Sequence, residues 1–181
     1  MKSWLLSAAI AMSVVPASVE ARQWSPEPRA AALDYAQIVH VKPNGQLVLV
    51  WWVVPEIFAP MPNTQPLLNV LSRYVVLGVA QGRPGANGAM AMDTVSAIQI
   101  TDQAGRTYAP LADNALPADV SQAIMTLQTI SRQTPLGPIA QGIRWFVFQA
   151  DGLNSCGSGK LSVPFGGETY TYDTPVPGCT K

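Results

Sequence analysis

The chain has 181 residues, of which 12% are charged against about 25% in typical globular proteins, and its formal net charge at pH 7 is zero. Its arginines are scattered singly, which argues against a nucleic-acid-binding protein because phosphate recognition needs clustered lysine and arginine. The length suits one domain with a single core. The low charge indicates either a surface that associates readily with a partner or, as the more common case, a surface made polar by Gln, Thr, Asn and Ser.

The N-terminus has the pattern of a secretory signal peptide. Lys2 gives the positive start, Trp4–Val15 gives an uncharged apolar stretch, and small residues flank a cleavage point after Ala21. A spanning helix needs roughly 20 apolar residues, and Pro16 interrupts this run earlier, so we expect residues 1–21 to be removed. An uncleaved anchor, or a cut after Ala17, is the alternative. The mature chain is predicted to be periplasmic or secreted, with no transmembrane anchor.

Residues 22–32 contain prolines and show no periodicity, so they are predicted to form a leader or linker before one domain at 33–181. Two β-branched and aromatic runs follow, Tyr35–Val41 and Gln46–Val54, and the Asn-Gly pair in Lys42–Gly45 between them predicts a tight hairpin. The second run is apolar at every position but its first, as expected for a strand that is covered on both faces.

Two segments are predicted to be surface loops. Pro55–Pro66 is rich in proline, and Gln81–Met92 is rich in glycine and alanine. Between them, Leu67–Leu71 fits either a helical turn or a strand, whereas Tyr74–Ala80 predicts a strand. Because loops carry function more often than scaffolds do, these two segments are candidates for contacts with a partner.

A hairpin and a helix are predicted next. Val95–Thr101 and Arg106–Leu111 are joined by a turn at Asp102–Gly105. The segment 117–132 starts with proline, has an aspartate in its first turn and repeats apolar residues at spacings of four and three, which predicts an α-helix. Its expected buried residues are Val120, Ile124, Leu127 and Ile130.

Three strands complete the chain. Ile143–Gln149 is aromatic on both faces, and Lys160–Phe165 pairs with Glu168–Tyr172 across a Gly166-Gly167 turn. Short strands at intervals of roughly ten residues predict a mainly β fold, an antiparallel β-sandwich with one inserted α-helix at 117–132.

The order of elements over residues 95–172 resembles the immunoglobulin-like accessory domains of bacterial exported proteins. The resemblance rests on Asp102–Gly105, on the following Arg106–Pro110, on Gly142–Phe148 and on the closing hairpin. It implies a sandwich in or outside the cell envelope. Those domains share no catalytic residues that could be assigned here, and the helix and long loops depart from their pattern.

The two cysteines, Cys156 and Cys179, are predicted to form a disulfide because an exported chain meets an oxidising compartment. The bond would tie the C-terminal tail to the domain and stabilise it by roughly 3 kcal/mol. A reactive thiol would instead need a neighbouring base, and the nearby sequence offers none.

Few residues suit catalysis or metal binding, so no catalytic residue, metal or cofactor is predicted. The one histidine, His40, is interpreted as structural or solvent-facing rather than catalytic. Gly157–Lys160 lacks the spacing of a phosphate-binding loop, and a calcium site shared by Asp113 and Asp119 has little support.

The carboxylates Asp151, Glu168 and Asp173 leave a glycan hydrolase as an alternative, which would require two of them to meet in one cleft. Whether the chain is an enzyme therefore stays open, with the residues favouring a non-enzyme.

Aromatic residues give the remaining candidates for a binding surface. Most are expected in the core, but Tyr170 and Tyr172 alternate on a late strand and are predicted to show a face. Phe58 and Arg83, on the two predicted loops, complete the candidate surface. We predict an exported, non-enzymatic domain that binds a protein partner or belongs to an envelope assembly. A carbohydrate-binding module with an exposed aromatic row is a further alternative.

Overall fold

The computed structural model describes residues 22–24, 36–39, 45–86, 89–133, 137–176 and 179, the first two of these segments by their backbone alone. The predicted signal peptide at 1–21, His40 and the turn residues 42–44 lie outside these residues.

The first sheet has the strand order β1-β10-β9-β6-β7. Its strands are β1 (Arg22–Trp24), β10 (Glu168–Thr174), β9 (Gly159–Phe165), β6 (Ile100–Asp102) and β7 (Thr107–Tyr108). Neighbours are antiparallel, except that β1 runs parallel to β10. The predicted leader is thus partly a strand at the edge of this sheet, a pairing that its proline-containing sequence does not indicate.

The second sheet is built around one long strand. Its strands are β2 (Ala36–Val39), β3 (Leu47–Val53), β4 (Val75–Pro84), β5 (Met90–Asp93) and β8 (Arg144–Phe148). All neighbours are antiparallel, and β4 pairs with β3 along one edge. Along its other edge, residues 75–79 pair with β8 and residues 81–84 pair with β5, so two strands share one edge.

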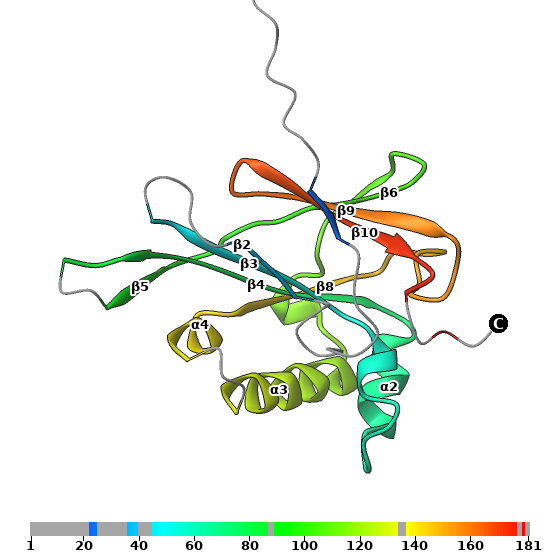
Figure 1. Cartoon of the computed structure of the whole chain (residues 1–181). Coiled ribbons are helices and arrows are strands. Elements are labelled where there is room, and N and C mark those ends of the chain that lie inside the picture. The colour runs from blue at the N-terminus through cyan, green and yellow to red at the C-terminus, as the bar shows by residue number, and fades with distance from the viewer. Residues whose placement is uncertain are drawn as a thin grey trace, which may run out of the picture.

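Helices cover the face of the second sheet that points away from the first sheet (Figure 1). They are α2 (Gln65–Leu71), α3 (Ala118–Arg132) and the short α4 (Pro138–Gln141), with 3₁₀ turns η1 (Pro55–Ile57) and η2 (Asp113–Ala115). The molecule is therefore mainly β with two sheets, as predicted, but the described residues form three helices where one was predicted. In the described part of the chain no helix has the length and apolar character needed to cross a membrane.

Strand β3 lies in the middle layer, and every one of its residues is buried. On one face, Trp52 meets Tyr172 of β10 edge to face, with ring centroids 5.7 Å apart. The Tyr172 hydroxyl also donates a hydrogen bond of 2.7 Å to the Val50 carbonyl. On the opposite face, Trp51 contacts Trp145 at 5.7 Å between ring centroids. The prediction of a strand covered on both faces is confirmed.

The two predicted loops are more ordered than expected. The Gly-rich segment is a hairpin: β4 continues to Pro84 and β5 returns from Met90, so the strands extend into the segment predicted to be a loop. In the proline-rich segment, Ile57 and Phe58 are buried behind η1, and α2 already begins at Gln65. The prolines correctly predicted that no strand runs through this segment. They did not indicate that the apolar residues between them are buried.

The predicted helix is confirmed as α3, but its buried face is rotated. Val120 and Leu127 are buried as expected, whereas the other buried positions are Ala123 and Ser131. Ile124 and Ile130 are only partly covered. Two of the four buried positions are thus small residues, which a count of large apolar residues does not select.

Two of the three predicted glycine turns form, and of the third, at 42–45, only Gly45 is described. Gly166 and Gly167, at φ 61° and 84°, join β9 to β10 in the left-handed region that a tight hairpin turn requires. Gly105, at φ 80°, closes the turn between β6 and β7.

Candidate functional site

Three of the four residues predicted to form a binding surface are buried, and for these the prediction is wrong. Tyr170 and Tyr172 are 0% exposed, and Phe58 is 1% exposed. Strand β10 lies inside its sheet between β1 and β9, and Tyr172 on its inward face packs on β3 of the second sheet. Phe58 closes η1 by donating its N–H to the Pro55 carbonyl, and its ring enters the core.

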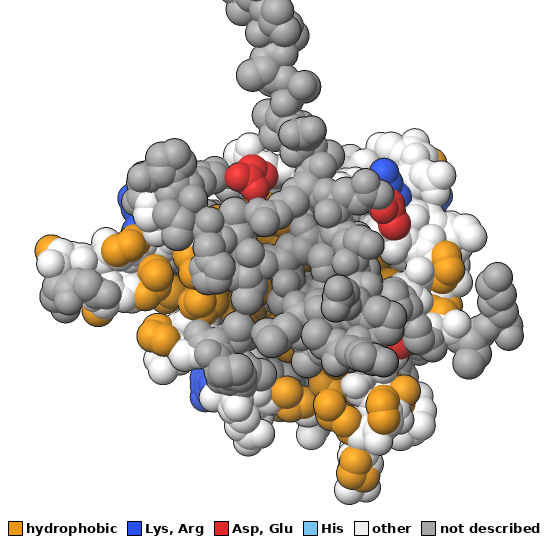
Figure 2. Space-filling model, in the orientation of Figure 1, with side chains coloured by type: hydrophobic (Ala, Val, Ile, Leu, Met, Phe, Trp, Pro, Cys, Tyr) orange, Lys and Arg blue, Asp and Glu red, His pale blue; other side chains and the backbone are white. Residues whose placement is uncertain are grey.

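Arg83 is exposed at the β4–β5 hairpin, where its guanidinium pairs with Asp93 at 2.9 Å. Hydrogen bonds from Arg83 and then from Gln81 lower the pKa of Asp93, and the same carboxylate raises the pKa of Arg83. This hairpin extends beyond the rest of the sheet, and hydrophobic side chains gather along it (Figures 1 and 2). Met90 and Met92 on β5 are only half-buried.

The aromatic residues considered for a sugar-binding row are all buried in the core. They are Trp51, Trp52, Trp145, Phe146, Phe148, Tyr170 and Tyr172. They hold the layers together, and none of these seven presents a ring for stacking on a sugar.

Two of the three carboxylates considered for a hydrolase, Glu168 and Asp173, do not meet in one cleft. Glu168 and Asp173 stand at opposite ends of β10, which at about 3.3 Å per residue separates them by roughly 16 Å. Asp173 lies 3.7 Å from the ammonium of Lys160. Asp113 and Asp119 do not share a cation either, because Asp113 pairs with Arg144 and Asp119 pairs with Arg73.

Asp102 organises the β6–β7 hairpin rather than a reaction. It accepts hydrogen bonds from the backbone N–H groups of Ala104 and Arg106, from the Arg106 guanidinium and from the Tyr108 hydroxyl. Burial opposes its ionisation, but the bonds from Arg106 and Tyr108 outweigh that effect and lower the pKa of Asp102. A depression of about 400 Å³ beside this turn includes Arg106 and Lys160, whose charges are both balanced by aspartates.

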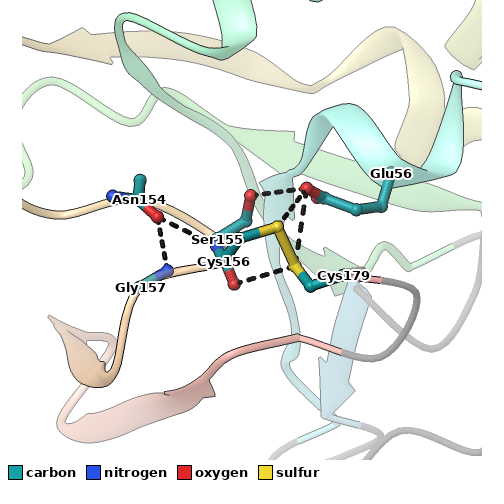
Figure 3. The surroundings of a disulfide bond; sticks show 6 residues. All are labelled: Glu56, Asn154, Ser155, Cys156, Gly157 and Cys179. Atoms are coloured by element: carbon teal, nitrogen blue, oxygen red, sulfur yellow. Dashed lines mark hydrogen bonds between the residues drawn. A yellow bond between two sulfur atoms is a disulfide. The ribbon is translucent and has the colours of Figure 1, made fainter. Parts of the chain in front are cut away.

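Cys156 and Cys179 form the predicted disulfide, with Cα atoms 5.4 Å apart. The bond joins the loop before β9 to the segment after β10, so it fastens the C-terminal segment to the sheet (Figure 3). Around it, Asn154 Oδ1 accepts hydrogen bonds from the N–H groups of Cys156 and Gly157.

A carboxylate lies directly against this disulfide. Glu56 of η1 places Oε1 3.0 Å from Cys156 Sγ and 3.7 Å from Cys179 Sγ, and it accepts a 2.9 Å hydrogen bond from the Ser155 hydroxyl (Figure 3). A disulfide sulfur has no hydrogen to donate, so both sulfur contacts are close approaches of oxygen to sulfur. Glu56 Oε2 is buried and has no hydrogen-bond partner among the described residues.

Glu56, Cys156 and Cys179 have the donor atoms for a metal site, with all three ligand atoms within 4.8 Å of one another. The metal-binding form of cysteine is the thiolate, and here both sulfurs are committed to the disulfide. In its oxidised form, therefore, this cluster offers a single carboxylate and does not fit a metal ion.

An open groove of about 480 Å³ lies where β5 and β8 meet on the edge of β4. We call it the strand-junction groove. It is lined by Met92, Asp93, Thr94, Val95, Ser96, Gly142, Ile143 and Arg144. The chain leaves β5 and enters β8 at this point, so two diverging backbone segments form its walls.

The groove continues along the outer edge of β8. A second hollow of about 220 Å³ shares Ser96 and Arg144 with it and reaches Leu111. There the Leu111 N–H donates a 2.7 Å hydrogen bond to the Val147 carbonyl, so part of this edge is already paired. Arg144 is half-exposed at the point shared by the two hollows, where it pairs with Asp113 and lies over the Phe146 ring. The sequence patterns did not indicate this groove.

No protein-family model matches the chain, and neither a curated protein nor a solved structure matches it.

Proposed function

We propose that the mature chain is an exported, non-enzymatic domain that binds an extended segment of a partner protein in the strand-junction groove. The observation that carries this proposal is the continuity of the groove along a strand edge, from Met92 past Ser96 and Arg144 to Leu111. An extended peptide fits such an edge, because main-chain hydrogen bonds supply affinity and adjacent hollows select side chains.

The shape of the groove favours a polypeptide over a small molecule. Small-molecule sites are mostly enclosed and apolar, whereas this groove is open and lined by both polar and apolar groups. Thr94, Ser96 and Arg144 are exposed along it, and the half-buried Met92 supplies an apolar contact. Flexible methionine side chains adapt readily to a partner's surface. Arg83 pairs with Asp93, which lines the groove, so we retain Arg83 as part of the proposed binding surface.

The charges of the described residues also favour contact over catalysis. Of the six lysine and arginine side chains that the structure describes, five are balanced by an aspartate, in the pairs Arg73–Asp119, Arg83–Asp93, Arg106–Asp102, Arg144–Asp113 and Lys160–Asp173. A surface of such balanced charges attracts a charged substrate weakly and suits a partner recognised through backbone and apolar contacts.

Export to the periplasm or beyond is part of the proposal. The disulfide supports it, because such bonds persist in oxidising compartments. We also propose that the two sheets form a sandwich related to the immunoglobulin-like type, with the contact between Trp52 and Tyr172 as support and the helical layer as an addition.

Site-specific photo-crosslinking in the cell of origin tests the proposal. A photoreactive phenylalanine derivative at Ser96, in the groove, is expected to capture one protein of the cell envelope. The same residue at Met125, which is 57% exposed on α3, serves as the control and should capture none. Equal products from both positions, or none from Ser96, would refute binding in the groove.

A further inference from the structure

We infer that Glu56 protects the Cys156–Cys179 disulfide from reduction by thiols. Its carboxylate oxygen lies 3.0 Å from one sulfur and 3.7 Å from the other. The reactant that Glu56 would repel is an anionic dithiol reductant. This role is separate from the proposed partner binding, because the disulfide and the groove are different parts of the molecule.

Reduction brings negative charge to both sulfurs in turn. A thiolate attacks one sulfur, the S–S bond breaks, and its electron pair leaves on the other sulfur as a thiolate. The second thiol of the reductant then resolves the mixed disulfide. In total two electrons and two protons pass to the cysteines, and the dithiol becomes a cyclic disulfide. Attack is expected at Cys156, which is exposed, with Cys179, which is half-buried, as the leaving group.

Glu56 opposes both charged stages. An attacking thiolate at Cys156 must approach a carboxylate 3.0 Å from its target atom. The leaving Cys179 thiolate would then face Glu56 Oε1 at 3.7 Å and the Ser155 carbonyl oxygen at 3.5 Å. Reactive cysteines have cations or helix N-termini beside them, whereas both neighbours here are oxygens. The hydrogen bond from Ser155 holds the carboxylate in this position.

Placing the Glu56 carboxylate against the disulfide costs folding free energy. Its second oxygen is buried without a hydrogen-bond partner among the described residues, and an apolar side chain there would avoid that cost. Glu56 belongs to η1, whereas its contacts come from the loop of residues 155–156 and from Cys179, so three separate segments meet at this carboxylate.

The test compares reduction rates of the full mature protein under native conditions. Glu56→Gln keeps an oxygen that can accept the Ser155 hydrogen bond and removes the charge. Dithiothreitol is expected to reduce this variant about tenfold faster than the wild type at low salt, and the ratio should shrink in 1 M salt. Glu168→Gln, which removes the same charge at the start of β10, is the matched control and should react at the wild-type rate.

A neutral phosphine reductant separates charge from unfolding. If Glu56→Gln merely loosened the fold, the rates of reduction by the phosphine and by the dithiol would rise by the same factor. That result would overturn the inference. Protection by charge requires a clearly larger gain for the anionic dithiol. Equal dithiol rates for wild type and Glu56→Gln, or the same gain in Glu168→Gln, would also overturn it.

Discussion

Gly78 lies between two tryptophans at the centre of the second sheet. It pairs with Trp51 on one side and with Trp145 on the other, so all three residues share one face. A Cβ at this position would lie 2.9 Å from Trp145 Cζ3 and 3.1 Å from Ile143 Cγ2. Only glycine leaves room for the Trp145 ring and the Ile143 side chain to pack against this position.

Gly78→Ala should therefore lower the free energy of unfolding by about 2 kcal/mol, because well-packed cores resist added atoms. Chemical denaturation with urea measures the change. Gly159→Ala on β9 is the control, since its nearest contact would be an ordinary 3.4 Å and its effect should stay within about 0.5 kcal/mol. Equal losses of unfolding free energy in the two variants would contradict a special packing requirement at Gly78.

Asp102 should make stability depend on pH. Its pKa is lowered in the folded state, so its contribution is present above the unfolded value of about 3.9 and is lost as pH falls through the folded value. Asp102→Asn can keep the backbone hydrogen bonds of the turn while losing the charge. Its urea midpoint should lie below that of the wild type at pH 7, and the two midpoints should converge below about pH 4. A constant gap across this range would contradict the role of the charge.

The residues of the disulfide were predictable, but their environment was not. Two cysteines in a chain that is predicted to be exported leave one pairing. Glu56, in contrast, is about a hundred positions from Cys156 along the chain, and only tertiary packing brings them together. Tyr170 and Tyr172 show the same limit, because strand alternation puts them on one shared face without telling whether it meets solvent or the other sheet.

At the scale of elements, α3 packs with a narrow buried stripe. Leu127 is 0% exposed within it, whereas Met125 is 57% exposed on the outer face. Leu127→Ala should lower the free energy of unfolding by about 3 kcal/mol through lost burial and a cavity. Met125→Ala should change it by less than about 0.5 kcal/mol. Similar values for both variants would mean that α3 does not pack as the structure shows.

Local sequence patterns predicted the presence of strands and of α3 better than they predicted where the elements end and which strands pair. The apolar run of β3 and the glycine turn between β9 and β10 have strong local signals, and both elements formed as expected. The strand segments 81–84 and 90–93 carry glycine, proline and alanine, whose propensity for strands is weak. They pair because segment 81–84 continues the well-formed strand β4, and segment 90–93 adds to its edge. The local sequence of either segment does not show this.

At the scale of the whole molecule, the helical layer explains both the buried β3 and the position of the groove. The first sheet and the helices cover the two faces of the second sheet (Figure 1), and the groove lies at its edge. The groove arises because β5 and β8 share one edge of β4, a topology that sequence periodicity does not encode. This is why composition could suggest a binding domain but not its surface.

The most direct test of this account is the affinity of the crosslinked partner for a variant whose groove is filled. Ser96→Trp places a large ring between the two hollows, and the account predicts at least about tenfold weaker binding than for the wild type, since hydrophobic filling displaces an extended segment. Met125→Trp on α3 should bind as the wild type does. Unchanged affinity for Ser96→Trp would contradict partner binding at this edge.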